Sequence, residues 1–333
     1  MTKTDQDYVQ PLGLDVGTSR IVVARMGDKK YRYDSQLNAF ITLPHSKLAE
    51  SLLLRENVFH EVHGSDIVVA GNDAGRFAEV FHVETRRPMA LGVLNPQEPH
   101  SLAVVRSIIT SLAGNAAAEG QKAFFSVPAP MDGSESFIAY HQASIARILA
   151  DLGYCPTPIG EGLAVVFGEL VDTNFSGIGI SCGSGLCNVC LAVLSVPVIA
   201  FSVPKAGDFI DHQAAMVTGD LANRMRIHKE HHFHLNGLTG ERVPDALTVY
   251  YQEMLVNLVE KLRAQISSSQ RLPKLEQPVP LVLSGGTAMP QGFLGAFKDV
   301  LRSHELPVKL AEVRVSSDPL NSTARGALMA ALC

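Results

Sequence analysis

Two short glycine-containing segments decide how this sequence folds. Residues Leu14–Ser19 read LDVGTS, and residues Ile180–Gly185 read ISCGSG. Each segment lies between two apolar stretches, a pattern that predicts a strand, a glycine turn and a second strand. One such hairpin opens each half of the chain. The sequence therefore indicates a duplicated architecture.

Further strands and helices are expected after each hairpin. In the first half the apolar spacing predicts a strand over Lys122–Val127 and helices over Ser101–Ala118 and Ser134–Leu152. In the second half it predicts a third strand over Val198–Val203, helices over Phe209–Met225 and Asp245–Ser267, and a buried strand over Leu281–Leu283. A short strand near Val308 and a final helix over Asn321–Leu332 complete an α/β pattern.

Length and composition exclude several classes of protein. The chain has 333 residues, of which 46% are hydrophobic and 18% charged, so it is too apolar to be disordered and long enough for two domains. Its net charge is −5, and its basic residues come in small groups rather than on one face. Direct binding of nucleic acid is therefore not expected.

The cysteines and the N-terminus indicate a cytoplasmic protein. Cys187 and Cys190 form a C-x-x-C, but no second pair completes a zinc site, so the five cysteines are expected to be reduced. Residues Met1–Pro11 are polar and lack the apolar region of a signal peptide. Ser176–Val203 has no charge, but its glycines and proline favour buried strands over a membrane helix.

The two hairpins are suited to hold a polyphosphate between them. Glycine lets the backbone approach a ligand closely, and turn amides donate hydrogen bonds to phosphate oxygens. The candidate amides are those of Gly17, Thr18, Ser19, Ser184 and Gly185. Asp15, beside the first turn, suits a hydrated Mg²⁺. Ordinary tight turns use the same residues, so a single hairpin is weak evidence and two equivalent ones are stronger.

A third glycine segment is a candidate site for a nucleoside. Residues Leu283–Gly292 read LSGGTAMPQG, in which a buried strand ends at two glycines and a helix soon follows. Such bare backbone lets a flat base or ribose lie against it, and the candidate contacts are Gly285, Gly286, Thr287 and Met289. The alternative is an ordinary strand-to-helix turn.

The order of these motifs resembles the nucleotide-binding fold of actin and the heat-shock-70 proteins, and most of all bacterial actins of the MreB and MamK type. The motifs that carry the resemblance are DVGTS at Asp15–Ser19, IGE at Ile159–Glu161, GSG at Gly183–Gly185, KAGD at Lys205–Asp208 and SGGT at Ser284–Thr287. Three further segments are similar, namely Pro88–Leu94, Ser126–Pro128 and Asp318–Gly326. The resemblance covers nearly the whole chain.

The resemblance implies two RNase-H-like α/β domains that flank a cleft for ATP or ADP with Mg²⁺. Domain I would comprise residues 11–160 and 317–333, and domain II residues 161–316. Glu161 would orient the water that attacks the terminal phosphate, and Asp15 would hold Mg²⁺ through water. Gly207, Asp208, Lys229 and Glu230 would complete the nucleotide site. The resemblance also implies head-to-tail filaments, so the expected partners are other copies of the chain and a cargo or adaptor protein.

The second hairpin departs from the family pattern D-x-G-x-G-T-[TS]-[DE]. Ser181 replaces the aspartate that helps to hold Mg²⁺, Leu186 replaces the threonine that helps to place the water, and Asn188 replaces the final acid. The glycines of the cradle remain. We therefore expect nucleotide binding to be kept and ATP hydrolysis to be slow, because a misplaced water loses the advantage of proximity.

Several alternatives stay open at this stage. Proteins of this fold also include small-molecule kinases and non-polymerising adaptor or chaperone-like modules. Four histidines lie within residues 228–234, and on a helix His228 and His232 would share a face and could bind a metal. No cysteine or carboxylate completes a convincing set, so an exposed loop at the edge of the adenine pocket is favoured. Met1–Gln10 lacks the apolar face of a membrane-binding helix, so direct membrane insertion is not expected.

The variant Ser181→Asp tests the alignment of the second hairpin. It restores the carboxylate of the family pattern, so Mg²⁺-dependent nucleotide binding should become stronger. Calorimetric titration of the nucleotide with and without Mg²⁺ measures the change. An unaltered Mg²⁺ dependence would argue against the alignment.

Overall fold

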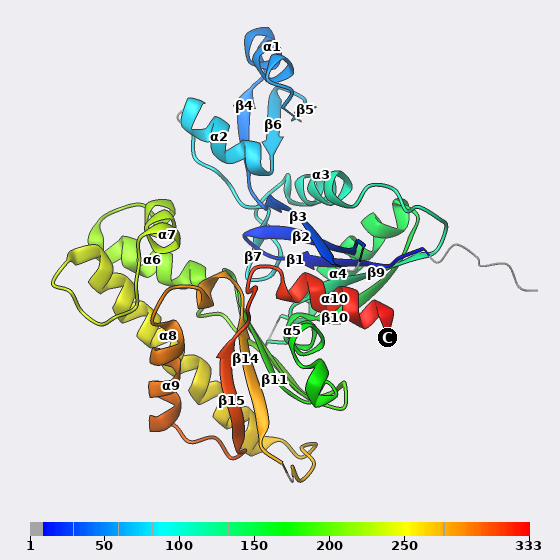
Figure 1. Cartoon of the computed structure of the whole chain (residues 1–333). Coiled ribbons are helices and arrows are strands. Elements are labelled where there is room, and N and C mark those ends of the chain that lie inside the picture. The colour runs from blue at the N-terminus through cyan, green and yellow to red at the C-terminus, as the bar shows by residue number, and fades with distance from the viewer. Residues whose placement is uncertain (1–8, 29, 59, 82, 132–133, 276) are drawn as a thin grey trace, which may run out of the picture.

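The computed structural model describes residues 9–28, 30–58, 60–81, 83–131, 134–275 and 277–333. Two five-stranded sheets dominate it (Figure 1). The first has the order β10-β9-β1-β2-β3, with bounds Tyr154–Gly160, Gln121–Val127, Leu12–Val16, Arg20–Met26 and Tyr31–Leu37. The second has the order β15-β14-β11-β12-β13, with bounds Leu310–Val315, Val279–Ser284, Gly177–Cys182, Cys187–Val193 and Val196–Val203.

The two sheets have the same topology, which confirms the expected duplication. In each, the glycine hairpin pairs antiparallel, β1 with β2 and β11 with β12, and a third antiparallel strand extends one edge. Two later strands then add in parallel on the other side, β9 and β10 in the first sheet, β14 and β15 in the second. The uncharged segment Ser176–Val203 thus forms three strands. Among the described residues, no helix has the length and apolarity needed to cross a membrane.

Helices cover the outer faces of both sheets and form two main cores. The helices α3 (Ser101–Ala113) and α4 (Glu135–Asp151) bury Val105, Ile109 and Ile145 against the first sheet. On the second sheet lie α6 (Gly207–Thr218), α8 (Arg242–Ser268) and α9 (Phe293–Ser303), and α7 (Ala222–His231) packs against α6. We call each sheet with its covering helices the first and the second lobe. The domain bounds of the sequence analysis stay a prediction.

Two predicted helices end earlier than expected, in both cases at a glycine with positive φ. The helix predicted over Ser101–Ala118 stops at Ala113, because Gly114 follows with φ +65°. The helix predicted over Phe209–Met225 is two helices, α6 and α7, because Gly219 caps α6 with φ +66°. Glycine adopts this left-handed conformation without the steric cost of a Cβ atom and so terminates helices.

A small subdomain projects from the first lobe at the top of Figure 1. Its three-stranded sheet has the order β4-β6-β5, with bounds Phe40–Pro44, Asp66–Ala70 and His60–His63. The helices α1 (Lys47–Arg55) and α2 (Asn72–Phe81) pack on this sheet and give it a core of its own. The chain then returns through the short hairpin β7 (Met89–Ala90) and β8 (Val93–Leu94).

Two helices lie between the lobes, α5 (Glu161–Glu169) and α10 (Ser322–Leu332) (Figure 1). Gly162 of α5 lies against the backbone of β12, and Gly13 of β1 lies against α10. The two helices meet where Gly326 of α10 lies directly on the carbonyl of Ala164. Any side chain at Gly326 would overlap this carbonyl, so the glycine sets how closely the helices approach.

A buried ion network holds the far end of the same helix pair. The side chain of Glu169 is 4% exposed and pairs with Arg314 of β15, 2.7 Å away, and with Arg325 of α10. The hydroxyls of Ser316 and Ser322 also donate to it. A single carboxylate therefore joins α5, β15 and α10.

The variant Gly326→Ala should destabilise the protein by about 3 kcal/mol, because overpacking at a rigid backbone contact cannot be relieved by a side-chain shift. Its matched control is Gly295→Ala in α9, where an added Cβ meets nothing within 4 Å. That variant should gain about 0.5–1 kcal/mol from helix propensity. Urea unfolding of both variants measures the difference, and an equal effect of the two would contradict the close helix contact.

Candidate functional site

A cavity of about 470 Å³ lies between the two glycine hairpins and is lined by residues of both lobes. Thirteen of the predicted site residues line it. They are Asp15, Gly17, Thr18, Ser19, Glu161, Ser184, Gly185, Lys229, Glu230, Gly285, Gly286, Thr287 and Met289. The structure therefore gathers residues from five separate regions of the sequence around one space.

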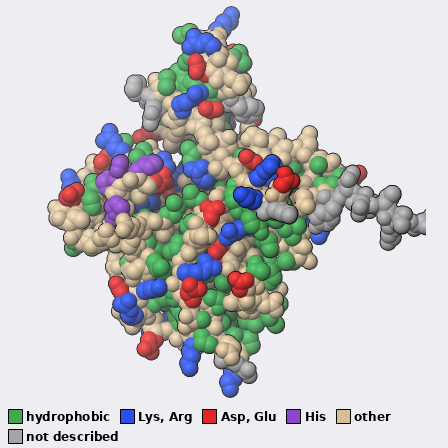
Figure 2. All heavy atoms as spheres, viewed as in Figure 1, with side chains coloured by type: hydrophobic (Ala, Val, Ile, Leu, Met, Phe, Trp, Pro, Cys, Tyr) green, Lys and Arg blue, Asp and Glu red, His purple; other side chains and the backbone are tan. Residues whose placement is uncertain are grey.

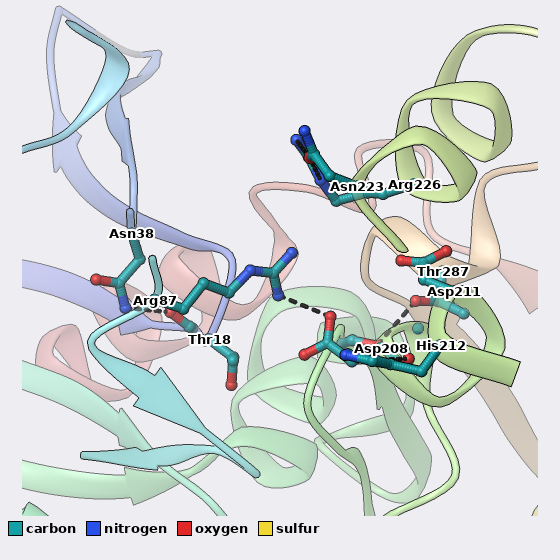
Figure 3. Close-up of polar contacts among 12 residues, drawn as sticks. Thr18, Asn38, Arg87, Asp208, Asp211, His212, Asn223, Arg226 and Thr287 are labelled. Carbon is teal, nitrogen blue, oxygen red and sulfur yellow. Dashed lines mark hydrogen bonds and ion pairs between the residues drawn. The ribbon is translucent and has the colours of Figure 1, made fainter. Parts of the chain in front are cut away.

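The first hairpin is fixed by its own hydrogen bonds. The amide of Gly17 donates to the carbonyl of Arg20, and Asn38 Nδ2 donates to the carbonyl of Gly17 at 2.9 Å (Figure 3). The hydroxyl of Thr18 accepts from the amide of Gly92 at 3.2 Å. The prediction that the Gly17 amide faces a ligand is thus wrong, because this amide closes the turn. The amides of Thr18 and Ser19 remain as candidate donors.

The second hairpin is held from below by the start of α6 and by the short 3₁₀ helix η2 (Gly286–Ala288). The carbonyl of Gly183 accepts from the amide of Gly207 and from the hydroxyl of Thr287, at 3.2 and 2.8 Å. The amide of Asp208 donates to the carbonyl of Ser184 at 2.7 Å. The carbonyls of Gly183 and Ser184 are thus used by hydrogen bonds within the fold, which fix the conformation of the turn.

The two hairpins come into contact at Gly185. A Cβ atom at this position would lie 2.5 Å from Thr18 Oγ1 and 3.0 Å from the amide nitrogen of Gly92. Only glycine fits between these atoms without a shift of the backbone. This close approach brings the two glycine turns into contact at the cavity, and together we call them the cradle. Thr18 in the first turn and Ser184 in the second are 166 residues apart in the sequence.

Two carboxyl groups line this cavity, the part-buried Asp15 and the buried Glu161, and each accepts a hydrogen bond from a serine. Ser126 Oγ donates to Asp15 at 2.8 Å, and Ser181 Oγ donates to Glu161 at 3.1 Å. Burial raises the pKa of Asp15 to about 6, although the bond from Ser126 lowers it. Burial, and after it the charge of Asp15, raises the pKa of Glu161 to about 8. Two carboxylates that repel each other in a buried site favour a cation between or beside them.

The predicted adenine pair, Lys229 and Glu230, divides into two roles. Lys229 Nζ lies 2.8 Å from Asp211 Oδ1 and donates to the carbonyl of Gly207 at 3.0 Å, and its side chain is 8% exposed. It therefore supports the base of the second hairpin. Glu230 instead pairs with Arg226 at 3.2 Å on the more exposed side of α7.

Gly207 and Asp208 do not line the cavity, although both were predicted to contact the nucleotide. Gly207 lies beneath the hairpin, where its Cα leaves room for Thr287 and Lys229. Asp208 pairs with Arg87 of the first lobe at 2.7 Å, so it bridges the lobes instead (Figure 3).

The four histidines of residues 228–234 form one cluster on the surface over α7 (Figure 2). His228 and His231 belong to α7, so the predicted loop is wrong, because the helix continues to His231. The rings of His228 and His232 lie 5.8 Å apart. Within the part of the chain that the structure describes, no group of three or more metal-binding side chains occurs.

Several residues of the cavity were not predicted from the sequence. Arg20 and Arg226 line it, and neither belongs to one of the motifs of the resemblance. His231 and His234 also line it, from the cluster that was expected at the edge of the adenine pocket, and so does Gly92 of the similar segment Pro88–Leu94, which was not named as a site residue. Arg20 directly follows Ser19 of the first turn, and this position in the sequence is the signal that could have marked it as a cavity residue.

Residues 11–331 match the model of the Volactin family. The chain belongs to this family. No curated protein matches it. In this chain the fold consists of two equivalent sheets, two central helices and a cavity between the hairpins.

Solved structures of bacterial actins are similar to this Volactin chain over almost its whole length. One is the MamK double helical filament, with a TM-score of 0.74, 19% identity and coverage of 97% of this chain and 98% of that one. Another is MreB 5 of Spiroplasma citri bound to AMPPNP, with a TM-score of 0.63, 12% identity and coverage of 95% and 93%. The ethanolamine utilization protein EutJ from Carboxydothermus hydrogenoformans has a TM-score of 0.56, 15% identity and coverage of 96% and 89%. The predicted actin-like ATPase fold is confirmed.

The raised pKa of Glu161 predicts how stability depends on pH in the protein without nucleotide or Mg²⁺. The folded state keeps the proton to about pH 8, whereas the unfolded chain releases it near 4.5. The free energy of unfolding should therefore fall as pH rises between these values. Glu161→Gln removes this dependence, so its stability relative to the parent should increase over that range.

Urea unfolding at about pH 5.5 and about pH 8.5 measures this change. The matched control is Glu312→Gln, at a side chain that is 63% exposed, and it should behave as the parent at both values. If the difference in unfolding free energy between Glu161→Gln and the parent is the same at both pH values, the raised pKa of Glu161 is contradicted.

Proposed function

We propose that this protein is an actin-like cytoskeletal subunit that binds ATP or ADP with Mg²⁺ and assembles head to tail into filaments, with slow hydrolysis of ATP. The observation that carries the proposal is the cradle at Gly185, where the hairpins of both lobes meet around one cavity. The predicted domains, residues 11–160 with 317–333 and residues 161–316, would be the two halves that close on the nucleotide.

The residues of the cradle fit a polyphosphate. Ser184 Oγ and Asn188 Nδ2 are buried at the cavity and have no hydrogen-bond partner among the described residues. Buried polar atoms without partners cost free energy, and a ligand that accepts from them would remove this cost. Together with the amides of Thr18 and Ser19 these donors suit an anion with many acceptor oxygens.

The carboxylates fit a divalent cation beside that anion. Asp15 lines the cavity and would hold Mg²⁺ through water, and the charge of a bound ion would favour the ionised forms of both Asp15 and Glu161. When bound, Mg²⁺ supplies positive charge to the phosphate oxygens. Ser181 provides a neutral oxygen where the family pattern has a second acid, so we expect a weaker site than in related proteins.

Glu161 is the group proposed to orient the attacking water. Its bond from Ser181 fixes the direction of the carboxyl group, and it lies at the start of α5, on a rigid element. Leu186 is 4% exposed and packs against Gly92 of the first lobe, so it offers an apolar side chain where the family has a hydroxyl. Water orientation therefore rests on fewer groups, which is the reason to expect slow hydrolysis.

The proposal of filaments is supported by the neighbour described as a MamK double helical filament, whose fold this chain shares over 97% of its length. A head-to-tail contact joins unlike surfaces, does not close and so generates a filament. A cargo or adaptor protein would bind the filament, and the cytoplasm would be its compartment.

Sedimentation and electron microscopy test assembly. Purified protein with ATP and Mg²⁺ should pellet and show filaments, and a non-hydrolysable analogue should give at least as much polymer, because slow hydrolysis would limit only disassembly. Protein that stays monomeric at high concentration with ATP, ADP and the analogue would favour a non-polymerising adaptor instead.

The variant Glu161→Ala tests hydrolysis separately. We expect an already slow rate of phosphate release to fall at least about tenfold, because removal of a water-orienting group forfeits proximity, while ATP binding is kept. Single-turnover release of phosphate and calorimetric binding give the two readings. An unaltered rate would remove Glu161 from this role.

A further inference from the structure

Asn188 connects the cavity to the other lobe. It lies on β12, directly opposite Ser181 in the hairpin, and is 1% exposed. Its Oδ1 accepts from the amide of Ala129, at a distance of 2.8 Å, in the segment that follows β9 of the first lobe. A side chain of the second lobe thus binds the backbone of the first lobe at the cavity wall.

The bond to Ala129 also fixes which way the amide group points. An N–H donor requires an acceptor, so the oxygen of Asn188 must face Ala129 and the nitrogen must face away from it. Nδ2 is buried and has no hydrogen-bond partner among the described residues. It lies near Glu161, whose carboxyl group is held by Ser181. The N–H donors of Nδ2 therefore face the end of the cavity where the carboxylates lie, and the nearby amide of Asn188 lowers the pKa of Glu161 against the larger effect of burial.

Two more bonds strengthen the contact between the lobes at this point. Ser202 of β13 donates from Oγ to the carbonyl of Ala129 at 3.0 Å, and its amide donates to the carbonyl of Pro130 at 3.1 Å. We call Pro128–Pro130, with Asn188 and Ser202, the interlobe strap. Asn188 belongs both to the strap and to the cavity wall. A ligand that binds Nδ2 would therefore contact the same side chain that joins the two lobes.

We propose that Asn188 donates a hydrogen bond to the terminal phosphate of a nucleoside triphosphate and thereby distinguishes a triphosphate from a diphosphate. This inference rests on the proposed function, because it assumes a nucleotide in the cavity. Asn188 lies beside Glu161 and Ser181, whereas Glu230 and Met289 line the part of the cavity assigned to the nucleoside. Contact with the terminal phosphate would add a ligand bond to the strap and stabilise the closed arrangement of the lobes.

An acidic residue at this position could not do the same. A carboxylate oxygen could still accept from Ala129, but it would present a negative charge and no donor to the phosphate. The two functions of the side chain, the strap and the phosphate contact, can therefore be separated by a change of one atom.

The variant Asn188→Asp is the main test. Calorimetry compares its binding of AMPPNP, a triphosphate analogue, with its binding of ADP, both with Mg²⁺. AMPPNP affinity should fall at least about tenfold more than ADP affinity, because a hydrogen bond to a charged group is lost and a repulsive charge replaces it. Asn188→Leu introduces no charge and should also reduce the preference for AMPPNP over ADP. It replaces Asn188→Asp in the test if that variant does not fold.

The variant Ser202→Ala is the matched control, because it removes one bond of the strap and leaves the amide of Asn188 in place. It should weaken AMPPNP and ADP by the same factor. If the Asn188 variants also weaken both nucleotides equally, the inference is overturned and Asn188 serves the strap alone. If the parent protein binds neither nucleotide, the proposed function fails instead, so the two failures are distinguishable.

Discussion

The close contact between α5 and α10 is the constraint on which the rest of the structure depends. Each helix packs on a different sheet, and they touch where Gly326 lies on the carbonyl of Ala164. At this point backbone lies directly against backbone, so the approach of the two helices cannot be adjusted by a side-chain rotation. The same pair of lobes meets again at Gly185, where the two hairpins come into contact.

The helix α5 links this joint to the cavity, because it carries a buried carboxyl group at each end. The two groups differ in whether a cation pairs with them. Glu169 at its C-terminal end is neutralised by Arg314 and Arg325. Glu161 at its N-terminal end has no cationic partner among the described residues, and burial raises its pKa. Glu161 therefore keeps its proton at neutral pH, whereas Glu169 is paired with two arginines. A buried carboxyl group with a raised pKa in a cavity is typical of a functional site, and a paired one is typical of a structural joint.

The departures in the second hairpin change the side chains at the cavity, whereas the glycines of the turn remain. Glycine positions preserve the backbone path, while Ser181 binds Glu161, Leu186 packs across the lobes and Asn188 joins the interlobe strap. Each substituted side chain therefore has a defined contact. Loss of family acids here does not leave gaps, since neutral side chains use the same space to bind the two lobes together.

The sequence by itself determined the two glycine hairpins, the duplicated α/β order and thirteen of the residues that line the cavity, because strand periodicity and glycine turns are local properties. It could not show that Asp208 pairs with Arg87, 121 residues away in the chain. Only the tertiary structure decided this point, and it also brought in Arg20, Gly92 and Arg226. The reason is physical: whether a polar group serves a ligand or the fold depends on partners that are distant in the chain.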